Sequence, residues 1–157
     1  MSLVAFDPGI STGCAIHTDE RYHVANGQTV VTPRQYITLV ITEPHKLWEV
    51  LEGQNPVHCC IFENFASGGL ISKDGQATLR LVGAIEAICY KMGIPVALQF
   101  PVERRGFIPI AREMLKQRGS TPISHEVDAL SHLLLYESRI EKGIQDVYAT
   151  RRRRTYS

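Results

Sequence analysis

The sequence predicts a single α/β domain in which three antiparallel-type strands precede alternating helices and strands. The chain has 157 residues, which suits one domain. Short apolar runs bounded by turn residues open the chain, and longer segments with apolar residues at helical spacing follow. We see no internal repeat and no low-complexity segment. We therefore expect residues 1–145 to form the domain and residues 146–157 to form a basic, flexible tail.

The first two strands are expected to form a hairpin. An apolar run at Leu3–Phe6 stops at Asp7-Pro8-Gly9, which is typical of a turn. A second apolar run resumes at Cys14–His17 after Gly13. Asp7 thus ends the first strand.

A third strand is expected between Tyr22 and Val31, because Thr29–Val31 is β-branched. Thr32-Pro33 then combines an N-cap residue with a proline at the first helical position. This pair predicts a helix from about Pro33 to Leu51.

The fourth strand is expected at Val57–Phe62, a continuous apolar run that suits a strand buried on both faces and that ends in Glu63. A glycine-containing loop follows from Asn64 to Lys73. Asp74 is then expected to cap a helix that continues to about Met92.

The last third of the chain continues this alternation. Val96–Phe100 predicts a fifth strand, and Ile110–Arg118 predicts a short basic helix. A final helix is expected from Ser124, as its cap, to about Lys142.

Composition and charge exclude several classes of protein. Hydrophobic residues at 44% and charged residues at 21% are ordinary for a globular domain. The net charge is +1, but residues 101–157 hold eleven basic and seven acidic side chains, which weakly supports a polyanionic partner. The four cysteines form no Cys-x-x-Cys pair, so a structural zinc site is not expected. Without a signal peptide or an apolar stretch of about 20 residues, we expect an intracellular protein with no membrane partner.

Four residues suggest chemistry because the fold can bring them together. Asp7 and Glu63 each end a predicted strand, and His125 and Asp128 lie in the first turn of the last helix. Oxygen ligands from separate elements suit Mg²⁺ or Mn²⁺, and two such ions assist an in-line phosphoryl displacement. The set therefore fits metal-dependent hydrolysis of a phosphodiester. His132 lies with His125 and Asp128 within a sector of about 60° on one face of the last helix. A histidine at such a position is more often packed or hydrogen-bonded than bound to a metal, so we leave it outside the predicted set.

Four motifs occur in the order of a known family: Phe6–Gly13, Ile61–Glu63, Gly75–Ala77 and His125–Leu130. They resemble the RuvC-type Holliday-junction resolvases of the RNase H-like nuclease superfamily. The resemblance implies an RNase H-like fold with a five-stranded mixed sheet flanked by helices. It also implies a homodimer that makes paired symmetric nicks in four-way DNA junctions, leaving 5′ phosphates and 3′ hydroxyls.

The same resemblance implies that Asp7, Glu63, His125 and Asp128 are catalytic and hold two Mg²⁺ or Mn²⁺ ions. His125 either binds metal or hydrogen-bonds the attacking water, since imidazole suits Mn²⁺ better than Mg²⁺. It further implies a compact bacterial or phage protein in the cytoplasm of a bacterium or an infected host.

DNA contacts are expected after the fifth strand and after Glu63. The family places a functional lysine after the fifth strand, where this chain has arginines; arginine binds phosphate well but does not shuttle protons at neutral pH. Phe65 either stacks on a junction base or packs as an ordinary aromatic residue. The expected DNA-binding residues are Phe65, Arg104, Arg105, Arg112 and Lys116. The tail arginines, Arg151–Arg154, either bind phosphates or form a solvated basic segment.

Three other functions are alternatives to the junction resolvase. A relaxed nuclease for branched DNA or flaps needs the same fold and the same acids. A phosphotransferase of the actin and sugar-kinase type needs two such domains, and 157 residues hold one. A non-catalytic DNA-binding module of this fold would be expected to lose a carboxylate, whereas this chain retains Asp7, Glu63 and Asp128.

Overall fold

A computed structural model describes residues 2–64, 72–119 and 121–143. The expected tail and Phe65 lie outside the described residues. Within these ranges the strands are β1 (Ser2–Asp7), β2 (Thr12–Thr18), β3 (Arg21–Ala25), β4 (Gln28–Thr32), β5 (Gln35–Ile41), β6 (Val57–Glu63) and β7 (Val96–Gln99). The helices are α1 (Lys46–Gly53), α2 (Lys73–Met92), the 3₁₀ helix η1 (Pro101–Phe107), α3 (Ile108–Gln117) and α4 (Ser124–Glu141).

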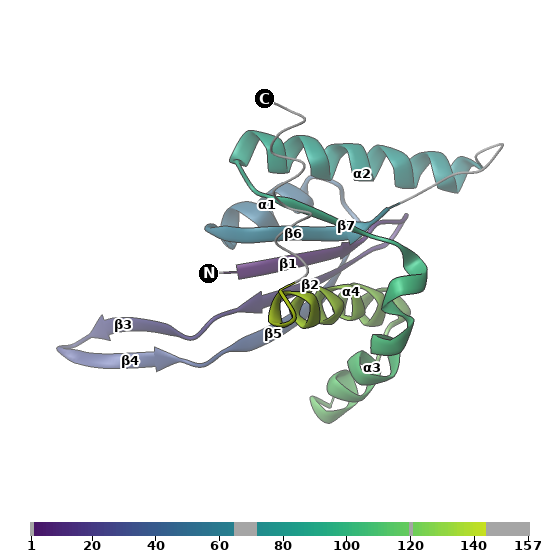
Figure 1. The fold of residues 1–157 in the computed structure, drawn as a ribbon. Helices are drawn as coiled ribbons and strands as arrows, with labels where there is room; N and C mark the ends of the chain where they lie inside the picture. Colours follow the sequence, from purple (N-terminus) through teal and green to yellow (C-terminus); the bar gives the residue numbers. More distant parts are fainter. Residues whose placement is uncertain (1, 65–71, 120, 144–157) are drawn as a thin grey trace.

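Five strands form one mixed sheet in the order β5-β2-β1-β6-β7 (Figure 1). β1 pairs antiparallel with β2 and parallel with β6. The outer pairs are antiparallel for β2 with β5 and parallel for β6 with β7. The predicted fold class, an α/β domain with a five-stranded mixed sheet, is therefore confirmed.

Helices cover both faces of this sheet, because its central strands bury both faces. Along β1, Val4 and Phe6 point into a core that includes Leu47 and Leu51 of α1 and several α2 residues. The alternate residue Ala5 points into the opposite core, against α3 and α4. This double burial explains why β1 and β6 appear in the sequence as continuous apolar runs.

The predicted third strand, from Tyr22 to Val31, is wrong. The chain instead forms the β3–β4 hairpin, a separate two-stranded sheet that extends well beyond the main sheet in Figure 1. Asn26 and Gly27 join its strands with φ values of +52° and +74°. Positive φ at both loop residues is the conformation that an Asn-Gly hairpin turn favours, and this signal splits the predicted strand in two.

The predicted helix from Pro33 to Leu51 is also wrong over its first half. Residues 35–41 form β5, which pairs with β2 from Thr12↔Ile41 to Thr18↔Gln35. The segment is rich in β-branched and aromatic residues, and pairing with the edge of β2 satisfies its backbone. Only α1 is helical, and it begins after Pro44.

Two predicted caps differ from the structure. Ser72, not Asp74, caps α2, and its side chain accepts a hydrogen bond from Gly75 N at 3.1 Å. Ser124 is the first residue of α4 and not its cap. No helix in the described part of the chain is long and apolar enough to cross a membrane.

Candidate metal centre

Four of the predicted site residues meet at one edge of the main sheet. Asp7 is the last residue of β1, and Glu63 is the last residue of β6. Because β1 and β6 are parallel with Phe6 opposite Phe62, the two carboxylates leave the sheet side by side. α4 begins at this edge and brings His125 and Asp128 to them.

Gly13 allows α4 to approach this edge. It lies opposite Asp7 in the pairing of β1 with β2. A Cβ atom at this position would lie 1.9 Å from the backbone oxygen of His125 and 2.4 Å from its carbonyl carbon. Only glycine leaves room for the first turn of α4, and this explains why the first motif ends in glycine.

Asp7 lies in an electrostatically costly position. Its Oδ2 is 3.3 Å from His125 Nδ1. Burial raises the pKa of the Asp7 carboxyl, and the charges of Asp128 and Glu63 raise it further, whereas the His125 contact lowers it in part. An ionised Asp7 therefore gains from any additional cation that reaches this edge.

Arg104 lies between the other two carboxylates. Its Nη1 donates to Asp128 Oδ1 at 2.7 Å, and its Nε lies 3.7 Å from Glu63 Oε2. The side chain is only 14% exposed, so this is a partly desolvated contact and not a surface ion pair. The predicted DNA-binding residue Arg104 thus lies inside the acidic cluster as a counter-charge.

The structure adds His132 to this cluster. Its Nε2 lies 3.3 Å from Glu63 Oε2, and its Nδ1 lies 2.7 Å from Oε1 of Gln99, the last residue of β7. Ligand atoms of Asp7, Glu63 and His132 all lie within 4.8 Å of one another. The shared helical face with Asp128 was visible in the sequence, but the burial that aims His132 at Glu63 was not.

The donor set fits a divalent ion. Two carboxylates and one imidazole on separate elements are ligands that Mn²⁺ and related ions accept, while Mg²⁺ prefers oxygen alone. Asp7, Glu63 and His132 are the group that the described residues offer, with His125 and Asp128 beside them. Bound there, an ion would offset the raised pKa of Asp7.

The other predicted DNA-binding residues lie apart from this cluster. Arg105 is exposed on η1, and Arg112 and Lys116 are exposed on α3. η1 is held to α4 by Arg139, whose Nη2 donates to Glu103 Oε1 at 2.6 Å. Burial raises the pKa of Glu103, but its hydrogen bond from Phe100 N and the Arg139 contact outweigh this and lower the pKa.

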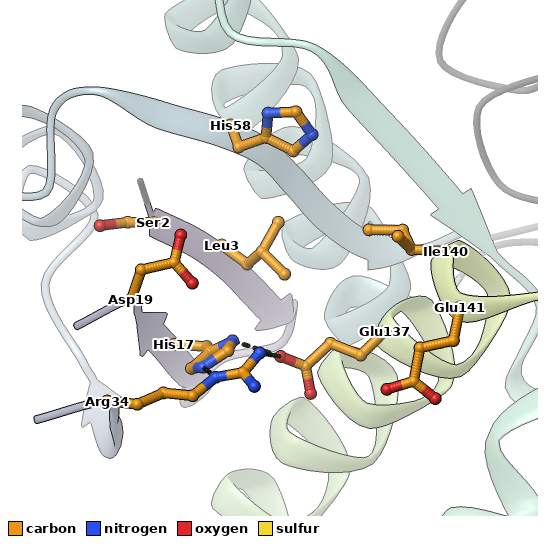
Figure 2. Close-up of a pocket in the computed structure, with 9 residues that line it drawn as sticks. All are labelled: Ser2, Leu3, His17, Asp19, Arg34, His58, Glu137, Ile140 and Glu141. Carbon is orange, nitrogen blue, oxygen red and sulfur yellow. Dashed lines mark hydrogen bonds and ion pairs between the residues drawn. The ribbon is translucent and has the colours of Figure 1, made fainter. Parts of the chain in front are cut away.

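A second polar cluster lies at the opposite end of β1 (Figure 2). His17, Arg34 and Glu137 of this cluster line a pocket of about 200 Å³ together with Ser2 and Leu3. Arg34 Nε donates to His17 Nε2, and His17 Nδ1 contacts Glu137. Tyr36 stacks on His17 with ring centroids 4.4 Å apart and donates to Glu137 Oε2 at 2.8 Å.

The pKa values in this second cluster follow from the same contacts. Burial and the nearby Arg34 lower the pKa of His17. Burial and the Glu137 hydrogen bond raise the pKa of Tyr36 to about 12. His17 is therefore a neutral ring that accepts from Arg34 on one side and faces a carboxylate with its N–H on the other.

The fold and the acidic edge define an RNase H-like α/β domain with a candidate metal centre. Comparison with solved structures identifies a similar protein: RuvC from Thermus thermophilus, at 16% sequence identity and a TM-score of 0.62, with 92% of this chain and 98% of that chain covered. The same T. thermophilus protein in complex with a Holliday junction substrate matches at 16% identity and a TM-score of 0.59, covering 92% and 97%. No family model and no curated protein matches the sequence. The chain thus has the RuvC-like fold that its motifs implied.

Proposed function

We propose that this chain is a metal-dependent endonuclease that cuts four-way DNA junctions. The observation that carries the proposal is the convergence of Asp7, Glu63 and Asp128 at one sheet edge of a RuvC-like fold. A buried carboxylate whose pKa is raised by burial and by neighbouring carboxylates, as that of Asp7 is, is costly to a fold unless a cation uses it. A structure of similar fold holds a Holliday junction, which supports branched DNA as the substrate.

Divalent ions, Mg²⁺ or Mn²⁺, would be held by Asp7 and Glu63 together with side chains from α4. When bound, such ions supply Lewis-acid activation of the attacking water and charge stabilisation at the phosphate. The carboxylates would position the ions. His125, 41% exposed and 3.3 Å from Asp7, is able to hydrogen-bond an incoming water.

Basic side chains around the centre would hold the DNA backbone. Arg105, Arg112 and Lys116 are exposed on η1 and α3, the two helices that follow Arg104 or contain it. Each phosphate contact adds affinity that is independent of sequence and sensitive to salt. Arg104 would stabilise charge at the reacting phosphate, since a guanidinium binds phosphate oxygens bidentately.

Paired cuts need two active sites, so we propose a homodimer. A two-fold protein matches the two-fold symmetry of an opened four-way junction. Each site would make one nick, leaving a 5′ phosphate and a 3′ hydroxyl.

Cleavage of a labelled mobile four-way junction tests this function. Matched duplex, flap and single-stranded DNA are compared in Mg²⁺ and in Mn²⁺, with Asp7→Asn as the control. We expect paired symmetric nicks in the junction that disappear in the variant while junction binding persists. Equal cutting of flaps or duplex would show a broader nuclease, and binding without cutting in either ion would show a non-catalytic module.

A further inference from the structure

The buried pair Gln99 and His132 is an unusual support for a carboxylate cluster. Both side chains are completely buried, Gln99 at the end of β7 and His132 in the third turn of α4. His132 Nδ1 lies 2.7 Å from Gln99 Oε1. Polar side chains with no exposure are costly unless each polar atom has a partner, and Gln99 Nε2 has none among the described residues, so the contact of Oε1 with His132 is the one that orients this pair.

Gln99 Oε1 accepts hydrogen bonds and cannot donate them, so the 2.7 Å contact places a proton on His132 Nδ1. In a neutral ring, Nε2 then carries a lone pair. This lone pair faces Glu63 Oε2 at 3.3 Å, where two acceptors meet with no hydrogen between them. A positive charge between the two atoms, either a proton on Nε2 or a metal ion, resolves this contact.

The surrounding groups limit where a metal ion can lie. Asp128 Oδ1 already accepts from Arg104 at 2.7 Å, so this oxygen is engaged. Asp7 is not engaged in this way, and its ligand atom lies within 4.8 Å of those of Glu63 and His132. The open position is therefore bounded by Asp7, Glu63 and His132.

We propose that His132 Nε2 is a direct ligand of the divalent ion, with Gln99 as the positioning residue that fixes its tautomer. A metal-binding histidine commonly donates its other N–H to an oxygen, which orients the ring and makes it more basic. A nitrogen ligand favours Mn²⁺, Co²⁺ or Zn²⁺ over Mg²⁺, so this site selects a transition-metal ion. The inference rests on the metal dependence proposed above and sharpens it.

Pulsed electron paramagnetic resonance of the metal-depleted full chain, reloaded with one equivalent of Mn²⁺, tests the ligand directly. A histidine bound to Mn²⁺ gives a ¹⁴N coupling that carboxylates do not give. We expect this coupling in the native protein and in His125→Asn, and we expect its loss in His132→Asn. Gln99→Met should keep the coupling but weaken Mn²⁺ binding by about tenfold or more, as loss of a ligand's support does.

Controls separate the ligand role from folding. Thermal unfolding in EDTA checks each variant, and His45→Asn, at an exposed histidine of the loop before α1, is the matched control. If His132→Asn does not fold, ¹⁵N-histidine NMR of the native protein gives the same answer, because added Zn²⁺ should shift Nε2 of His132 while its Nδ1 keeps its proton.

Three results would overturn the inference: a ¹⁴N coupling that survives in His132→Asn and is lost in His125→Asn, no ¹⁴N coupling in the native protein, or an Nε2 of His132 that carries a proton in saturating Zn²⁺. The last result also corresponds to the reversed Gln99 amide, in which Nε2 of Gln99 donates to the ring. Junction cleavage is measured separately. A nitrogen-coupled ion in a protein that cuts no DNA would support this inference and refute the proposed function.

Discussion

Two polar clusters lie at opposite ends of the main sheet, and α4 contributes to both. At the start of β1, His17, Arg34, Tyr36 and Glu137 form a chain in which donors and acceptors alternate. At the end of β1, Glu63 and Asp128 contact one arginine, Arg104, and the third carboxylate, Asp7, contacts His125. Both clusters contain a buried histidine.

The difference lies in the balance of charge and not in the types of residue. In the first cluster one carboxylate, Glu137, faces one guanidinium, Arg34, although burial still raises the pKa of Glu137. In the second, Asp128 and Glu63 help to raise the pKa of Asp7, so the groups oppose one another. This teaches that a buried polar cluster points to a ligand when its own members leave charge in excess.

The largest effect is expected from Asp7→Asn, which removes one carboxylate from the acidic cluster. Asp7→Asn should reduce junction cleavage by about a thousandfold or more, because a charged ligand is lost where charge develops. The same variant should be more stable than the native protein without metal. A raised carboxyl pKa means that stability falls as pH rises from about 4 through that pKa, so at neutral pH the cost is fully present and the amide removes it.

Cleavage assays and thermal unfolding in EDTA across pH 4 to 8 measure both effects of Asp7→Asn. The stability gain should vanish toward pH 4. If Asp7→Asn is less stable than the native protein at pH 7, the charge of Asp7 does not destabilise the metal-free protein.

Gly13→Ala is expected to have the next largest effect. Its methyl group would meet the His125 backbone oxygen at 1.9 Å, and backbone cannot rotate away. Overpacking of this kind costs about 1–3 kcal/mol, and it should also weaken Mn²⁺ binding by displacing the first turn of α4. Urea unfolding and a Mn²⁺ titration measure the two effects. Gly83→Ala, in α2 with open space around it, is the matched control; it should leave Mn²⁺ binding unchanged and raise stability by about 0.5–1 kcal/mol, because alanine favours a helix interior over glycine.

Arg104→Gln tests the charge excess of the acidic cluster, because it removes the arginine that contacts Glu63 and Asp128. A partly buried ion pair of about 1 kcal/mol corresponds to about fivefold in affinity, so Mn²⁺ binding should tighten by about that factor. The metal-free protein should lose stability because Glu63 and Asp128 lose their partner. Calorimetric titration measures the affinity, with the exposed neighbour Arg105→Gln as the control. Equal affinities in the native protein and Arg104→Gln would show that Arg104 does not compete with the ion.

The smallest expected effect concerns the balanced cluster. Because the pKa of His17 is lowered in the folded protein, the unfolded chain binds its proton first as pH falls below about 6.5. Stability should therefore fall between pH 6.5 and 5, with a slope of at most about 1.4 kcal/mol per pH unit from this residue. His17→Gln should flatten the slope in chemical denaturation. An unchanged slope would mean that His17 already carries a proton beside Arg34.

The sequence predicts the centre of the fold well and its periphery less well. β1, β6 and α4 are long apolar or periodic segments whose burial leaves a clear pattern. The β3–β4 hairpin and β5 were missed because Thr32-Pro33 has the signature of a helix start, while the pairing of β5 with β2 is a tertiary contact.

The same division holds for the candidate site. Asp7, Glu63, His125 and Asp128 follow strand ends or begin a helix, so sequence places them at one edge. Arg104 became part of the cluster through the fold of η1, and His132 through its burial against Gln99. No local pattern carries either contact, since both depend on how β7 and α4 pack.

α4 carries residues of both clusters, so the position of this one helix affects both. Asp128 and Glu137 are nine residues apart on this helix, which corresponds to about 13 Å of rigid rod. A tilt of about 5° about one end would move the other end by about 1 Å, a displacement large enough to disturb a reaction geometry. Tyr36 and His17 contact Glu137 and so help to fix the position of α4. These contacts therefore help to keep the side chains of the acidic centre in their relative positions.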